Sequence, residues 1–288
     1  MKFIKLVLPL ISLGAAIAVP CAAGSRTIYG ADDRMDFFAV SPELQKLADS
    51  TVTFFPASQV GPDGALNIDL TETFGKNRNL CATERFYSQP SASMCSGALV
   101  APGIVMTAGH CSMHFDCAKT KIVFGYAVRE AGVMPSRIPP EEIYGCAGII
   151  AEEFKEGSAD YALLKTDRPV TNHVPLRLNR TGRIEAGAVV VAMGHPYGIP
   201  LKIAGGATVR DASHPDFFVT DTDTYISNSG SAVFNAETHL VEGILVRGDN
   251  DFVWQNGCNV SLVNPQNGGR GEDVTKVALV LPFLPKPQ

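Results

Sequence analysis

Positive charge is scarce in this sequence, and no stretch of it is strongly basic. The 288 residues include 24 Lys and Arg against 29 Asp and Glu, which gives a formal net charge of −5. An acidic chain of this kind offers little electrostatic attraction to nucleic acid or to anionic membranes. We therefore expect neither of them as a partner.

Long apolar runs are missing as well, except near the N-terminus. Two lysines precede a nearly apolar stretch over residues 6–19, which ends in small residues. A run of about 14 residues is short for a membrane span and typical of an export signal. We predict that residues 1–23 are a signal peptide, which makes the mature chain secreted or periplasmic with a formal charge of −7. A lipid anchor on Cys21 is the alternative, and Pro20 before it fits that processing poorly.

Six cysteines remain after the predicted cleavage, an even number. In an oxidising compartment they indicate up to three disulfides. The spacing Cys111-x-x-His114-x-x-Cys117 also resembles part of a zinc site, which would need thiolates and a fourth ligand. Export favours disulfides, and we predict no metal. The six are Cys81, Cys95, Cys111, Cys117, Cys146 and Cys258.

Helical periodicity is also rare. It is convincing only over residues 272–281 and weaker over 42–48. Elsewhere short β-type runs alternate with Gly, Pro, Asn and Asp, and there is no internal repeat or low-complexity tract. This spacing predicts an all-β barrel or sandwich. The clearest runs are 51–55, 98–100, 121–124, 148–151, 161–164, 189–192, 217–219, 232–234 and 240–246.

Turn-forming residues between positions 167 and 175 suggest a boundary between two β domains. We predict an N-terminal extension with the first strand or strands over residues 24–80. The first barrel would then occupy residues 81–170. The second, with a C-terminal helix, would occupy residues 171–288. A cleft between two such domains is a common place for a site built from both.

Three short segments contain residues suited to acyl transfer. His110 lies in Thr107-Ala108-Gly109-His110-Cys111, Asp160 enters an apolar strand, and Ser229 lies in Ser227-Asn228-Ser229-Gly230-Ser231. A serine is unreactive unless a positioned base takes its proton. A lone serine in such a stretch is usually part of a turn, and an aspartate at a strand start is commonly a surface residue. The three together predict a nucleophilic site.

These segments resemble a known family. Residues 95–100 and 105–111 look like the histidine region of chymotrypsin/trypsin-like serine proteases, and residues 160–164 resemble its aspartate strand. Residues 228–235 resemble the serine region of the bacterial branch that includes the glutamyl endopeptidases. The resemblance runs from about residue 95 to residue 248. It implies two packed antiparallel Greek-key β-barrels with the active site in the cleft between them.

The resemblance also assigns roles to individual residues. Ser229 would be the nucleophile, His110 the general base and then the general acid, and Asp160 the residue that orients the imidazole. The N–H groups of Ser227 and Ser229 would form an oxyanion hole. Such chemistry implies no cofactor. A disulfide between the cysteines at 95 and 111 would close the loop that holds the histidine.

Substrate contacts follow from the same resemblance. The strand residues Leu245, Val246, Arg247 and Gly248 would pair with a protein or peptide substrate as an added β-strand. Asp223, six residues before the serine, would favour a basic P1 residue through a charge-assisted pair. One alternative is that Asp221 takes this role. Another is that Arg247 attracts an acidic group instead. The histidine of the glutamyl branch is missing from residues 243–248. We expect a monomer.

Two residues depart from the family pattern. Ser227 stands where the family usually has glycine, which bears on the oxyanion hole. Asn228 stands where the animal digestive enzymes have an aspartate that pairs with a new amino terminus. Ile28 begins a faintly similar activation sequence, but we read it as an ordinary early segment. The alternative function is a catalytically inactive homologue that binds a protein partner. An esterase-type hydrolase is disfavoured because the Gly-x-Ser-x-Gly elbow is missing.

Overall fold

The computed structural model describes residues 27–114 and 116–286. The predicted signal peptide over residues 1–23 lies outside the described residues. Within the described ranges, no helix has the length and apolar character needed to cross a bilayer.

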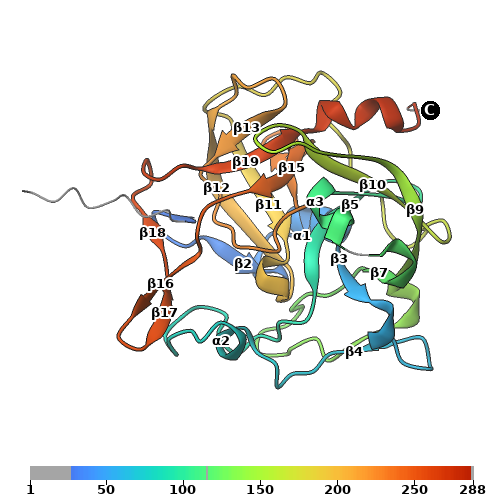
Figure 1. Cartoon of the computed structure of the whole chain (residues 1–288), viewed down its shortest axis with the longest axis horizontal. Coiled ribbons are helices and arrows are strands. Elements are labelled where there is room, and N and C mark those ends of the chain that lie inside the picture. Colours follow the sequence, from blue (N-terminus) through green and yellow to red (C-terminus); the bar gives the residue numbers. More distant parts are fainter. Residues whose placement is uncertain (1–26, 115, 287–288) are drawn as a thin grey trace, which may run out of the picture.

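Six antiparallel strands close into a first barrel, in the order β10-β6-β5-β3-β7-β9 (Figure 1). The strand β9 pairs with both β7 and β10, which closes the barrel. The strands are β3 (Thr51–Pro56), β5 (Met94–Ala101), β6 (Ile104–Thr107), β7 (Thr120–Val123), β9 (Ile143–Phe154) and β10 (Asp160–Thr166).

A second barrel has the order β11-β14-β15-β19-β13-β12 and closes through the pairing of β11 with β12. A short N-terminal strand, β2 (Arg34–Asp36), adds to its edge beside β12. The expectation of two antiparallel barrels is therefore confirmed. The six strands are β11 (Val189–Gly194), β12 (Lys202–Asp211), β13 (Phe217–Thr220), β14 (Ala232–Asn235), β15 (Val241–Arg247) and β19 (Glu272–Lys276).

Smaller elements connect and flank the barrels. The two-stranded sheets pair β1 with β18, β4 with β8 and β16 with β17. Their bounds are β1 (Ile28–Tyr29), β18 (Val263–Asn264), β4 (Leu66–Asn67), β8 (Arg137–Ile138), β16 (Phe252–Gln255) and β17 (Cys258–Ser261). The helices are α1 (Pro42–Ala48), α2 (Phe74–Asn77) and α3 (Gly109–His114), with 3₁₀ turns at Phe37–Ala39, Ala57–Gln59, Cys117–Lys119, Pro140–Glu142 and Pro196–Gly198.

Alternation along the strands explains how the barrels pack. On β10, Ala162 and Leu164 lie in the core of the first barrel, whereas Tyr161 and Leu163 belong to a cluster shared by both barrels. Successive side chains of a strand point to opposite faces, so a strand buried on both sides is apolar throughout. The shared cluster also contains Met193 of β11. The contact between the barrels is therefore apolar.

The segment predicted as a C-terminal helix has a different structure. Residues Glu272–Lys276 form β19, which pairs with β13 and β15. Two 3₁₀ turns follow, at Val277–Leu279 and Leu281–Phe283. The prediction of a helix from residue 272 was wrong because the strand is buried between its neighbours, and this tertiary pairing outweighs the local apolar spacing. The helix expected over residues 42–48 is confirmed as α1, which begins after the capping residue Ser41.

All six cysteines within the described ranges form disulfides. The bridge expected between Cys95 and Cys111 is present, and the others join Cys81 to Cys258 and Cys117 to Cys146. Bridges that close loops of these sizes contribute on the order of 3–5 kcal/mol each to stability. The two cysteines of the zinc-like spacing are thus each bonded to a different partner.

Candidate active site

His110 and Asp160 are brought together by the pairing of β6 with β10. His110 lies in α3, directly after β6, and Asp160 is the first residue of β10. The imidazole Nδ1 is 2.7 Å from the Asp160 Oδ2, and the main-chain N–H of His110 donates to Oδ1 at 3.0 Å. Asp160 is fully buried, whereas a quarter of the His110 side chain is exposed. The buried acid therefore fixes a histidine that remains accessible.

Gly109 permits this approach of α3 to the barrel. A Cβ at this position would overlap the main chain of Glu153 and of Tyr161. Glycine is the residue that allows such a close contact of two backbones. Its place directly before His110 therefore sets the position of the imidazole.

Ser229 lies in the loop between β13 and β14, with its main chain packed against the first barrel. Its carbonyl oxygen accepts a hydrogen bond from Ser96 N–H at 2.8 Å and lies 3.7 Å from the Cys111 Sγ. The next residue, Gly230, has φ +93° and donates its N–H to the Leu245 carbonyl at 2.7 Å. Ser229 is therefore held beside the disulfide of Cys111, the residue that follows His110. The structure thus brings all three segments together.

The turn around Ser229 leaves two N–H groups without an acceptor. The N–H groups of Asn228, Gly230 and Ser231 donate to main-chain carbonyls at 2.7–3.0 Å. Across the described ranges, no acceptor faces the N–H of Ser227 or of Ser229. Two unsatisfied donors on alternate residues are the arrangement that an oxyanion hole needs.

Ser227 has the backbone conformation that glycine usually provides. Its φ is +71°, in the left-handed region, which costs a residue with a Cβ about 1–2 kcal/mol. Its carbonyl accepts a hydrogen bond from the Ser96 hydroxyl at 2.9 Å, and the same hydroxyl oxygen accepts the N–H of His195 at 2.9 Å. Ser96 therefore stabilises the strained turn. Ser96 lies in the segment 95–100 that carries the family resemblance, but no pattern there assigned it this role.

Asn228 is buried and makes a contact without charge. Its side-chain oxygen accepts a hydrogen bond from the Ser231 hydroxyl at 3.4 Å. Asn228 therefore places no charge behind Ser229.

A cavity of about 280 Å³ opens next to Ser229. The predicted substrate strand lines it with Leu245, Val246, Arg247 and Gly248. The guanidinium of Arg247 is paired with Asp273 at 2.9 Å and also donates to the Ser158 carbonyl. The guanidinium of Arg247 is thus already engaged, with an acid that also pairs with Arg270 at 2.6 Å. The rest of the lining is Thr27, Thr224, Tyr225, Ile226, Ser229, Asp249, Asn250, Asp251 and Glu272.

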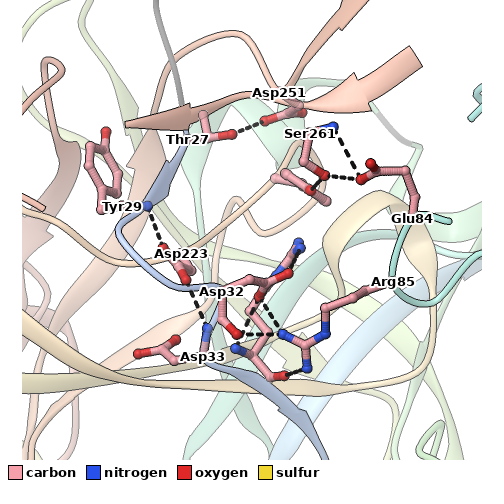
Figure 2. Close-up of polar contacts among 11 residues, drawn as sticks. Thr27, Tyr29, Asp32, Asp33, Glu84, Arg85, Asp223, Asp251 and Ser261 are labelled. Carbon is pink, nitrogen blue, oxygen red and sulfur yellow. Dashed lines mark hydrogen bonds and ion pairs between the residues drawn. The ribbon is translucent and has the colours of Figure 1, made fainter. Parts of the chain in front are cut away.

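Asp223 is not part of this lining. Its two carboxylate oxygens accept the N–H groups of Tyr29 and Asp33, at 2.8 and 3.0 Å (Figure 2). Asp221 is engaged in a similar way by the N–H of Thr208. The assignment of Asp223 to the cavity, based on its distance from Ser229 in sequence, is therefore corrected: the carboxylate faces the main chain of an N-terminal segment.

Three other acids line the cavity, and sequence reasoning missed them. Glu272 accepts hydrogen bonds from the Thr224 hydroxyl at 2.9 Å and the Tyr29 hydroxyl at 3.2 Å. Burial raises the pKa of Glu272 to about 8, and the charge of Asp251 adds to that effect. Burial likewise raises the pKa of Asp251. The third acid is Asp249.

Glu272 also explains a glycine of the substrate strand. A Cβ at Gly248 would overlap the carboxylate of Glu272. The segment around Glu272 gave only a helical spacing in the sequence, and it enters the site because β19 pairs with β15. No local signal could have placed it there.

The likeness to known proteins agrees with this architecture. The family of the trypsin-like peptidase domain matches residues 95–244, just over half of the 288 residues. The chain belongs to this family. No curated protein matched the sequence. The assignment to the glutamyl-endopeptidase branch stays a prediction.

Two solved structures show the extent of the likeness. The VesB protease of Vibrio cholerae is 12% identical with a TM-score of 0.51, and the match covers 90% of this chain and 66% of that one. The inactive Ser343Ala mutant of Rv3671c from M. tuberculosis H37Rv is 13% identical with a TM-score of 0.48, covering 88% of this chain and 93% of that one. This chain thus spans about two thirds of the VesB structure. At 12% identity the likeness to the VesB protease concerns the fold.

Proposed function

We propose that this chain is an exported serine endopeptidase that hydrolyses peptide bonds through an acyl-enzyme, with a preference for a basic P1 residue. The observation that carries the proposal is the pairing of a fully buried Asp160 with His110 at 2.7 Å beside the loop of Ser229. The disulfides and the N-terminal pattern support export.

The reaction follows from the proton positions. Because Nδ1 of His110 faces the Asp160 carboxylate, Nδ1 carries the proton and Nε2 is free to accept one. Nε2 takes the Ser229 hydroxyl proton while Oγ bonds to the substrate carbonyl carbon. The negative oxygen formed there accepts the N–H groups of Ser227 and Ser229. His110 then gives its proton to the leaving amine as the C–N bond breaks. In the second half, His110 deprotonates a water that bonds to the acyl carbon, the bond to Ser229 Oγ breaks, and His110 returns the proton to Ser229.

The acids of the cavity support the basic preference. Among the described residues, no basic side chain forms an ion pair with Glu272 or Asp251. A buried acid without a cation is stabilised when a ligand supplies one. A lysine or arginine side chain in the cavity would do so, with Glu272 in the role first assigned to Asp223. The preference is therefore retained and its residue is changed.

Labelling with a fluorophosphonate tests the reaction. The reagent is expected to form one adduct, on Ser229, as mapped by peptide mass spectrometry. Ser229→Ala abolishes the adduct, and His110→Ala slows its formation by roughly 10³-fold or more because the base is lost. A folded wild-type protein that takes no label overturns the proposal and favours the inactive homologue.

A further inference from the structure

An N-terminal strap, residues 27–34, lies against the wall of the cavity although it is far from that wall in sequence. Its strand β1 pairs in parallel with β18. Ile28 and Tyr29 are almost fully buried, with 1% and 2% of their surface exposed. Several of the contacts that hold residues 27–34 in place are drawn in Figure 2.

Asp223 is the anchor of the strap. Its two oxygens bind the N–H groups of Tyr29 and Asp33, which lie on either side of a short turn. Burial raises the pKa of Asp223 to about 6, and these two hydrogen bonds oppose the rise. A buried carboxylate without hydrogen bonds would be costly. The acid and the strap therefore stabilise each other.

A second group of contacts joins the strap to the lining of the cavity. The Thr27 carbonyl accepts the N–H of Thr224 at 3.4 Å, and the Thr27 hydroxyl donates to Asp251 at 3.1 Å. The hydroxyl of Tyr29 donates to Glu272 at 3.2 Å. Three lining residues on three different segments, Thr224, Asp251 and Glu272, are thus hydrogen-bonded to the strap.

The far end of the strap is fixed on Tyr225, the next lining residue. The guanidinium of Arg34 forms two hydrogen bonds with Asp32, at 2.7 and 2.9 Å, and lies 3.9 Å from the centre of the Tyr225 ring. Arg85 donates to the carbonyls of Asp32 and Arg34. A cation over an aromatic ring is attracted by the ring's negative face, most strongly in a buried setting. Thr224 and Tyr225, two consecutive residues of the cavity wall, are therefore both in contact with the strap.

We propose that Asp223 is a positioning residue of this peptidase: by anchoring the N-terminal strap, it fixes residues 224–226 and with them the turn that presents the N–H groups of Ser227 and Ser229. The inference rests on the proposed function. Every contact uses main-chain groups or side chains that an uncut chain already has, so the wall forms without a free amino group at Thr27 or Ile28. Both oxygens of Asp223 face the strap, so it does not meet the substrate.

The test compares Asp223→Asn with Glu242→Gln. In the first variant an NH₂ group faces an N–H of the strap, whereas in the second the affected contact is the hydrogen bond from Asn179. Both acids are almost fully buried, which makes the second a matched control. We expect D223N to slow fluorophosphonate labelling and to weaken benzamidine binding by about 10–100-fold each, as for a lost hydrogen bond to a charged group. E242Q stays within about threefold of wild type, and D223N retains the selectivity for lysine over leucine at P1.

Two results overturn the inference: a folded D223N that is labelled and binds benzamidine like wild type, or one that loses only the selectivity for lysine. If D223N does not fold, Thr27→Val serves instead, since it removes one hydroxyl contact to Asp251 and leaves Asp223 in place. It should weaken benzamidine binding about threefold or more. An unchanged affinity refutes the proposal that the strap positions the cavity wall. Benzamidine binding needs no catalysis, so a wild-type protein that resists labelling refutes the peptidase, while the D223N comparison still decides the strap.

Discussion

Asp160 holds His110 at two points, one on the imidazole and one on the main chain. Its two carboxylate oxygens lie 2.7 Å from Nδ1 and 3.0 Å from the backbone nitrogen of the same residue. These two contacts together fix the position of α3 and the rotation of the imidazole ring. They also set the tautomer, because the nitrogen that faces a carboxylate carries the proton.

Replacing Asp160 by asparagine should therefore separate folding from chemistry. The amide keeps the shape but no longer selects the tautomer with a free Nε2, and we expect kcat to fall by roughly 10³–10⁴-fold. Turnover of a peptide ester measures this. Asp167→Asn, on the same barrel and exposed, is the control and should stay within about twofold. A D160N enzyme with near wild-type kcat would remove Asp160 from the proposed site.

Glu272→Gln should change selectivity more than rate. Loss of a carboxyl group that ionises beside a bound lysine is expected to lower kcat/KM for lysine substrates by about 10–100-fold, as for a charged hydrogen bond, and to leave leucine substrates nearly unchanged. Glu242→Gln, a buried acid hydrogen-bonded to Asn179, is the matched control. Equal losses on both substrates would mean that Glu272 only supports the fold.

The difference between Glu272 and the triad shows what a sequence can reveal. His110, Asp160 and Ser229 each lie in a run of neighbours with its own pattern, and the Cys95–Cys111 bridge spans only 16 residues. The cavity, in contrast, is built from four segments far apart in sequence, which β-pairing and contacts such as that of Thr224 with Glu272 bring together. A count of residues from Ser229 selected Asp223, but that carboxylate turns toward the strap. Which way a carboxylate faces depends on the neighbours that the fold supplies.

Ser227→Gly tests whether the left-handed residue limits the enzyme. Glycine adopts φ +71° without steric cost, which should raise the unfolding free energy by up to about 1 kcal/mol. Because the two N–H groups are already unpaired, the labelling rate of Ser229 should be equal to or above that of wild type. Denaturant unfolding and labelling kinetics provide the two numbers. Slower labelling in S227G would show that the serine side chain itself is needed.

Ser96→Ala should loosen the same turn from outside it. Without the hydroxyl, the N–H of His195 and the Ser227 carbonyl both lose a buried partner, which costs about 1–3 kcal/mol for each unsatisfied group. We expect lower stability and slower labelling of Ser229, by about tenfold. Ser93→Ala removes a hydroxyl that accepts a hydrogen bond from the Thr53 hydroxyl, and it should leave labelling unchanged. If both variants are labelled at the same rate, the turn does not depend on Ser96.

The stability of the first barrel should depend on pH through His173. Its ring lies between Asp49 and Glu142, with nitrogen–oxygen distances of 2.8 and 2.7 Å, and stacks on Phe124. Burial opposes its charge, but the hydrogen bonds to the two acids outweigh this and raise the pKa of His173 to about 9.

The sign of the effect follows from the raised value. The folded state binds this proton more tightly than the unfolded state, so the contribution is fully present below pH 6.5 and is lost as the pH rises through about 9. Glu272 acts in the same direction between about pH 4.5 and 8. Denaturant unfolding at several pH values should show His173→Gln to be less stable at pH 6 and to have a smaller decline toward pH 9. Because the two residues lie in different barrels, H173Q and E272Q should reduce the decline additively. If the unfolding free energy of H173Q declines with pH as much as that of the wild type, groups other than His173 cause the decline.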